Sequence, residues 1–225
     1  MKYLKLFESL ENIRKTCKEY GIKNYTINSD GSIDVDGNVD LHDMNLMKLP
    51  IKFKNINGHF DCGKNNLSNL EGSLENITGY FYCRHNNLKN MKGFPKKIGG
   101  GLYCIYNNLT SLEGSPTYVG NGFYCYSNNL TSLEYSPTYV GGDFHCSNNK
   151  ITSLEYFPSN LGGNFYCLNN PVYNLWILFK DTSKIELFND YDIIRGTDIV
   201  IDRLNDFLIT IGKDPVESVK GYNNI

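Results

Sequence analysis

The chain of 225 residues contains no alanine and no glutamine, and only four of its 22 basic residues are arginines. Alanine is the best helix former, so its absence argues against a bundle of helices. The basic residues are balanced by 24 acidic ones, which leaves a formal net charge of −2. This lack of positive excess argues against a protein whose main role is to coat nucleic acid or anionic lipid.

Long apolar runs are also missing. The most apolar stretch is VYNLWILF, at residues 172–179, and it is far too short to span a bilayer. The first residues, MKYLKLFESLENIRK, carry charges throughout and lack the apolar segment of a signal peptide. We therefore expect a cytoplasmic protein with reduced thiols and no membrane partner.

What the chain does contain is a regular row of cysteines. Six of its seven cysteines follow one another at intervals of 21 residues: Cys62, Cys83, Cys104, Cys125, Cys146 and Cys167. A fixed period in this range is typical of a solenoid, in which each unit buries its apolar face against its neighbours. The cysteine row therefore predicts a repeat protein.

The residues around each cysteine are constant in kind. Phe or Leu stands two positions before it, Asn three positions after it, and apolar residues five and eight positions after it. A first unit with Val39, Leu41, Leu46 and Leu49 fits the same frame, with leucine in the cysteine position. Seven units are thus predicted over residues 37–176. Glycines before each strand predict a turn, prolines predict an extended return segment, and the asparagine row predicts side chains that cap turn backbone.

The segment F-x-C-x-x-N-x-L-x-x-L resembles the signature of the leucine-rich-repeat family, with cysteine in one leucine position. The short repeat and the following L-E-x-S-P-x-x-V-G-G turn resemble the short bacterial type, whose similar reading frames are common in tailed-phage genomes. This resemblance implies an α/β solenoid with a parallel β-sheet on its concave face. It also implies a phage-encoded protein that acts in the host cytoplasm on a host bacterial protein.

Both ends of the stack need covering, because a repeat stack exposes an apolar face at each end. Residues 1–36 predict an N-terminal cap: a helix followed by a hairpin of residues 25–27 and 33–35. The helix has apolar residues at helical spacing: Leu4, Phe7, Leu10, Ile13, Cys17 and Tyr20. Residues 177–225 predict a C-terminal helical cap, with one helix opened by Pro171 and a second after Thr197 or Asp198.

No residue set in the sequence commits the chain to catalysis or to a cofactor. Zinc sites need four converging ligands, usually with C-x2–4-C spacing, whereas these thiols form a straight row pointing into a core. We therefore interpret the cysteines as small buried apolar residues. A recurring glutamate row is interpreted as a solvated stripe rather than a cation site: Glu71, Glu113, Glu134 and Glu155. We predict no enzyme, no metal and no cofactor.

The outward positions of the predicted strands are unusually aromatic. If Phe and Cys point inward, their sequence neighbours point outward, because side chains alternate along a strand. Tyrosine offers rigid contact area with a hydroxyl group, as binding surfaces do. The alternative is that tyrosines stacked across strands only stiffen the sheet. The predicted partner-binding residues are Tyr80, Tyr82, Arg84, Tyr103, Tyr106, Tyr124, Tyr126, Asp143, His145 and Tyr166.

These observations predict a non-enzymatic module that binds a protein partner, and the resemblance implies that it acts as an inhibitor or a counter-defence factor. One alternative is a ligand binder or enzyme with a pocket where the solenoid meets the C-terminal cap. Another is a structural or assembly protein. Nucleic-acid binding would use the aromatic residues with Arg84, His85 and His145, but the acidic balance weighs against it.

Overall fold

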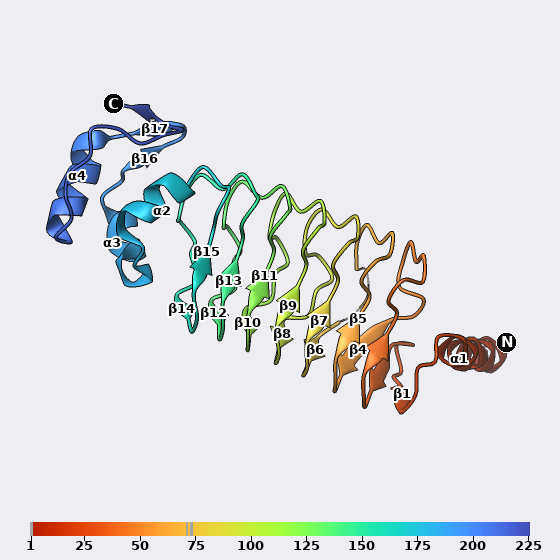
Figure 1. The fold of residues 1–225 in the computed structure, drawn as a ribbon. Helices are drawn as coiled ribbons and strands as arrows, with labels where there is room; N and C mark the ends of the chain where they lie inside the picture. Colours follow the sequence, from red (N-terminus) through yellow and green to blue (C-terminus); the bar gives the residue numbers. More distant parts are fainter. Residues whose placement is uncertain (1, 71, 73) are drawn as a thin grey trace.

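The structure is a computed structural model and describes residues 2–70, 72 and 74–225, with the backbone alone for residues 2–8. Leu4, Phe7 and Glu71 therefore lie outside the described side chains. Figure 1 shows a stack of short strands that runs along one axis, with helices at both ends of the chain. The predicted repeat solenoid is confirmed at this level.

The strands that contain the Phe-x-Cys motif form one parallel sheet of seven strands. Each strand has two residues and pairs in register with the strand one repeat away, as Phe123 does with Phe144. From the first repeat to the last, the strands are β3 (Val39–Asp40), β5 (Phe60–Asp61), β7 (Phe81–Tyr82), β9 (Leu102–Tyr103), β11 (Phe123–Tyr124), β13 (Phe144–His145) and β15 (Phe165–Tyr166).

A second sheet, of eight strands, was not predicted from the sequence. It forms where the repeats were expected to run back as extended chain after each proline, and its strands pair in parallel except for the hairpin β1–β2. That hairpin was predicted. The strands are β1 (Tyr25–Ile27), β2 (Ile33–Val35), β4 (Phe53–Ile56), β6 (Asn76–Ile77), β8 (Lys97–Ile98), β10 (Tyr118–Val119), β12 (Tyr139–Val140) and β14 (Asn160–Leu161).

The corner between the two sheets requires glycine. An added Cβ on Gly120 would overlap the carbonyl oxygen of Gly99 one repeat earlier, and the same holds for Gly141 against Gly120. These glycines have no left-handed φ angle, so it is the close approach of backbones that excludes a side chain. The predicted turn before each strand is therefore present, and its glycines serve close packing.

The core is a set of ladders in which like residues stack on like residues. Phe60 stacks on Phe81 with ring centroids 5.4 Å apart, and Phe123 stacks on Phe144 at 5.2 Å. The repeat cysteines lie in the same core and are at most 1% exposed. The predicted inward direction of Phe and Cys is thus confirmed.

The asparagines form a buried hydrogen-bonded ladder beside this core. The side-chain oxygen of Asn86 accepts a hydrogen bond from the Leu67 amide at 2.9 Å. Its nitrogen donates to the carbonyls of Cys62 at 3.0 Å and Cys83 at 3.2 Å. The same pattern recurs at the other asparagines of the row, so each carboxamide ties two neighbouring repeats together, as predicted.

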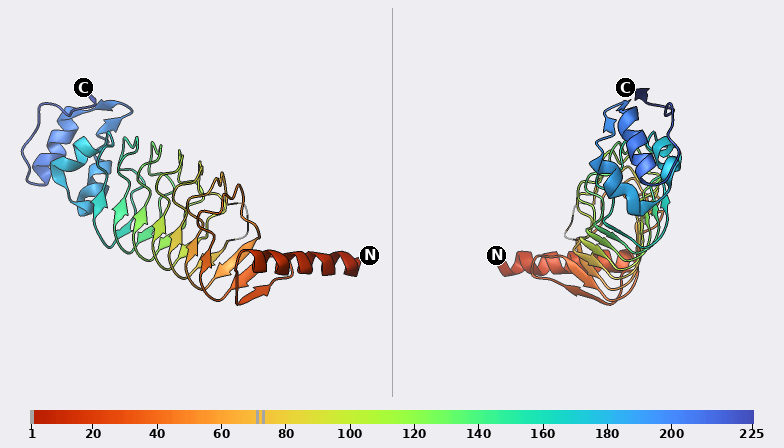
Figure 2. Two further views of the ribbon diagram at one scale, coloured as in Figure 1. Left: turned by 45° about the vertical axis from the view of Figure 1, so that its right-hand side comes forward. Right: turned by 90° about the vertical axis from the view of Figure 1, so that its left-hand side faces the viewer.

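The N-terminal helix α1 (Lys2–Glu19) leads into the hairpin β1–β2. Cys17 is buried, and Ile13 packs against the core from a partly buried position. Figure 2 shows that the first turns of α1 project away from the stack. Contact with the stack is therefore made by the last turns of the helix.

Beyond the last repeat the chain forms short elements: α2 (Tyr173–Phe179), η1 (Thr182–Lys184), α3 (Ile185–Asp190), β16 (Ile194–Arg195), β17 (Asp198–Ile199), α4 (Ile201–Thr210) and β18 (Asn223–Asn224). The Trp176 ring lies edge-on to Phe165 at 5.1 Å, and the Tyr222 hydroxyl donates to the Thr152 carbonyl at 2.9 Å. These contacts join the C-terminal segment to the last repeats. Helix α2 runs across residue 176, where the sequence predicts the end of the repeats.

None of the helices formed by the described residues combines the length and the apolar character that a bilayer crossing needs.

Candidate functional site

The repeat cysteines are buried, and their thiols stay protonated at neutral pH. All seven cysteines are free and buried. Burial raises the pKa of each repeat thiol above its ordinary value, to about 12 for Cys167. The described residues hold no group of three or more His, Cys, Asp or Glu side chains placed to bind a metal ion. The geometry therefore matches the interpretation of these cysteines as packing residues.

A thiol reagent tests this directly. We expect none of the seven thiols to react with Ellman's reagent within minutes at pH 7.5. The reagent cannot reach the buried thiols, and burial disfavours the reactive thiolate form. All seven should react in 6 M guanidinium chloride. Rapid modification of a repeat cysteine in the folded protein would contradict the packing interpretation.

The outward side chains of the seven-stranded sheet form what we call the tyrosine face: Tyr80, Tyr82, Arg84, Tyr103, Tyr106, Tyr124, Tyr126, Asp143, His145 and Tyr166. The structure brings their rings into one connected series. The Tyr103 ring lies tilted against that of Tyr82 at 5.0 Å and stacks on that of Tyr124 at 4.5 Å. The series continues through His145, whose ring lies 5.3 Å from that of Tyr166.

A second row of rings lies beside the first. Tyr126 contacts His145 at 4.6 Å and Tyr106 at 5.7 Å, and Tyr106 stacks on His85 at 4.7 Å. The rings remain partly accessible, with Tyr106 49% and Tyr166 44% exposed. The predicted stacking across strands is therefore present, and it leaves a continuous aromatic surface open to solvent.

The polar groups of the tyrosine face lie toward its ends. The Arg84 guanidinium sits 5.2 Å from the centre of the Tyr82 ring and 3.5 Å from the Asp61 carboxylate. Asp143 accepts a hydrogen bond from the backbone amide of Asn164 at 2.8 Å, so its carboxylate holds the corner of the next repeat in place. The Tyr80 hydroxyl accepts from the Asn121 side chain at 2.9 Å.

The middle of the tyrosine face is uncharged at neutral pH. Burial, together with the neighbouring Tyr124, raises the pKa of Tyr103 to about 12. Burial also lowers the pKa of His145, an effect that the nearby Asp143 carboxylate partly opposes. The face therefore presents neutral hydroxyl groups on rigid rings, which suits contact with a protein surface.

Sequence reasoning missed a feature of the backbone. The residue two positions after each repeat cysteine has a left-handed φ: Lys64, His85, Tyr106 (52°), Ser127, Asn148 and Asn169. Tyr135 and Tyr156 also have left-handed φ angles and are 54% and 60% exposed. Three earlier repeats have glycine at this position, ten residues after the cysteine, and the replacement of glycine by tyrosine is the signal that could have found them.

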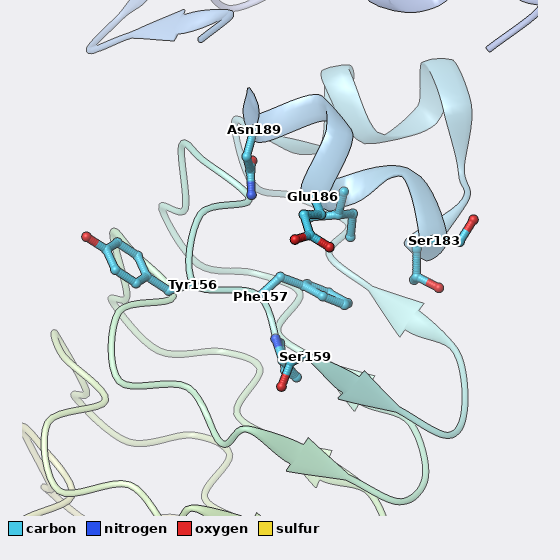
Figure 3. A pocket seen from close by; sticks show the side chains of 9 residues that line it. Tyr156, Phe157, Ser159, Ser183, Glu186 and Asn189 are labelled. Carbon is cyan, nitrogen blue, oxygen red and sulfur yellow. The ribbon is translucent and has the colours of Figure 1, made fainter. Parts of the chain in front are cut away.

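The junction between the last repeat and the C-terminal helices is hollowed, as the alternative prediction of a pocket requires. One hollow of about 350 Å³ lies between residues 156–159 and the segment of η1 and α3. In Figure 3 the side chains of Glu186 and Asn189 lie opposite Phe157, and Tyr156 points away from them. Its lining residues include no His or Cys, and Glu186 is its sole titratable acid.

Comparisons with models of protein families, with curated protein sequences and with solved structures find no match to this chain.

Proposed function

We propose that this chain is a leucine-rich-repeat protein whose tyrosine face, on the concave side of the solenoid, binds a protein partner. Helix α1 with its hairpin and the C-terminal helices act as caps of the stack. The protein is phage-encoded and its partner is a protein of the bacterial host, which it inhibits. The observation that carries the proposal is the connected, partly exposed series of rings across five adjacent strands.

The exposure of the rings favours binding over stiffening alone. Stacking would stiffen the sheet equally well with the rings covered, yet Tyr106 and Tyr166 stay about half exposed. The left-handed φ of Tyr106 recurs at the same position in the other repeats, as at Lys64 and Ser127, so it belongs to the turn of the solenoid and does not bear on binding.

The test is partner recovery with a matched pair of variants. Tyr103→Ser with Tyr124→Ser removes two rings from the centre of the tyrosine face. Loss of two central aromatic anchors should weaken binding by about 100-fold or more, since a single anchor is worth about 2 kcal/mol or more. Affinity purification from the host identifies the partner, and calorimetry with that partner measures the loss.

The control uses the other sheet. Tyr118 and Tyr139 also stack, with ring centroids 4.7 Å apart, but on the outside of the eight-stranded sheet. Tyr118→Ser with Tyr139→Ser removes a comparable ring pair and should leave the affinity unchanged. Equal affinity of the wild type and the Tyr103/Tyr124 variant, with both variants folded, would reject the tyrosine face as the binding surface.

A further inference from the structure

The last strand of the seven-stranded sheet carries amides without acceptors. In each repeat, three alternate N–H groups donate to the next repeat. In the repeat before last, Phe144 donates to the Asn164 carbonyl at 2.9 Å, Cys146 to Tyr166 at 2.8 Å and Asn148 to Leu168 at 2.8 Å. Strand β15 is the edge of the sheet, and the corresponding donors of the last repeat are Phe165, Cys167 and Asn169.

Within the described part of the chain, no residue accepts a hydrogen bond from these three N–H groups. Two of them belong to buried residues, because Phe165 is 6% and Cys167 1% exposed. The edge therefore has hydrogen-bonding capacity that a further strand would satisfy.

There is room for such a strand. Two hollows, of about 480 and 410 Å³, lie beside β15 and share Phe165, Tyr166, Trp176 and Lys180 as lining residues. The second of them shares Thr182 with the hollow shown in Figure 3. Together the three follow residues 156–168, which is the course that a further repeat would take.

The residues that line the two hollows indicate what kind of peptide would bind there. Donors two residues apart along a strand are spaced at about 6.6 Å, which matches alternate carbonyls of an extended peptide. Leu168 is 51% and Tyr166 44% exposed beside Tyr173 and Trp176, so the wall toward the tyrosine face is apolar. Lys180 lines both hollows, and Asp181, which lines the second of them, uses its carboxylate to accept hydrogen bonds from the Ser183 amide and hydroxyl.

We propose that an extended peptide segment of a partner protein adds to β15 as a further strand. Its carbonyl groups accept hydrogen bonds from the N–H groups of Phe165 and Cys167. Its apolar side chains contact Leu168 and Trp176, and an acidic side chain pairs with Lys180. This is strand addition at a sheet edge, a recurring mode of peptide recognition. It rests on the proposed function only in that the partner is a protein.

The probe is a synthetic peptide with blocked ends that copies residues 141–149, with serine in place of Cys146. In the stack the carbonyls of Asp143, His145 and Ser147 accept from Phe123, Cys125 and Ser127 of the preceding repeat, so the segment offers acceptors in the register that the free edge needs, and it includes the acidic Asp143. With the full-length protein and millimolar peptide, we expect the amides of Phe165 and Cys167 to exchange with deuterium about tenfold more slowly. The amides of Phe123 and Cys125 should be unaffected.

Three controls make the result decisive. The same peptide with N-methyl groups on Asp143, His145 and Ser147, whose peptide groups would face β15, cannot pair as a strand and should give no protection. Lys180→Glu should weaken peptide binding about tenfold, whereas Lys150→Glu, an exposed lysine of an earlier repeat, should not. The Tyr103/Tyr124 variant should keep full protection, so failure of the tyrosine face and failure of this site are distinguishable.

Two outcomes would overturn the proposal. One is unchanged exchange at Phe165 and Cys167 when the peptide is saturating. The other is protection that rises with protein concentration in the absence of peptide, because a second copy of the chain would then occupy the edge.

Discussion

Replacing Asn107 by alanine is expected to lower the free energy of unfolding by about 3–5 kcal/mol. The side-chain oxygen of Asn107 accepts from the Leu88 amide at 3.1 Å, and its nitrogen donates to the carbonyls of Cys83 at 3.0 Å and Cys104 at 3.2 Å. Asn107 is only 7% exposed, so water cannot replace the lost partners freely. Each buried group left unpaired costs about 1–3 kcal/mol.

The neighbouring asparagine provides the control. Asn108 is exposed, and its side chain donates only to the Asn87 side chain, at 3.5 Å. Asn108→Ala should change stability by less than about 0.5 kcal/mol, as is usual for surface positions. Urea unfolding followed by circular dichroism measures both variants. Equal stability of the two would mean that the asparagine ladder contributes little to holding the repeats together.

The strands of the seven-stranded sheet were predictable because the cysteines mark them. Within this sheet, β5 and every later strand begin two residues before a repeat cysteine, as β5 does with Phe60 before Cys62. Burial of a side chain at a fixed place in the repeat forces its sequence neighbours outward. The direction of the tyrosines therefore followed from the cysteine row, although the contacts between their rings did not, because ring contacts depend on rotamers.

The second sheet escaped prediction because its strands, most of them as short as those of the first sheet, are not marked by a distinctive residue such as the cysteine. Strand β10 consists of Tyr118 and Val119, and β12 of Tyr139 and Val140. A sequence of two residues fits a hydrogen-bonded strand and an unpaired extended segment equally well. The preceding proline favours an extended backbone but does not specify which hydrogen bonds it makes. The available signal was the aligned row of Ile and Val, four residues before each inward Phe or Leu, which recurs with the period of the repeat.

The elements after residue 176 were predictable only in part. Apolar spacing indicated helices, and α2 and α4 are present, although α4 begins at Ile201, later than expected. Helix α3 and the strands β16, β17 and β18 are six residues long or shorter. Their positions depend on contacts between residues far apart in the chain, such as Tyr222 with Thr152. A local pattern carries no information about such contacts.

Raising the pH above about 9 is expected to unfold the protein steeply. Burial raises the pKa of the six repeat thiols well above the ordinary value of 9.0 for cysteine. The native state thus keeps six protons that the unfolded chain releases. A raised pKa gives stability that is complete below the unfolded pKa and is lost as the pH rises toward the folded value, about 12 for Cys167.

The size of the effect follows from the number of thiols. Each contributes about 1.4 kcal/mol per pH unit above its unfolded pKa, so six contribute about 8 kcal/mol per unit. By pH 10 the loss reaches roughly 8–12 kcal/mol, which equals the whole stability of a typical domain. Urea midpoints measured between pH 7 and pH 10 under reducing conditions should therefore fall sharply above pH 8.5.

A variant with fewer thiols separates this effect from other alkaline changes. Cys104→Val with Cys125→Val keeps an apolar side chain in the core and removes two of the six protons. The slope above pH 9 should then fall by about 3 kcal/mol per pH unit, which is one third of the thiol contribution, since tyrosine and lysine ionisation is shared by both proteins. A slope identical to that of the wild type would show that the thiols are ionised alike in both states, and burial would then not raise their pKa.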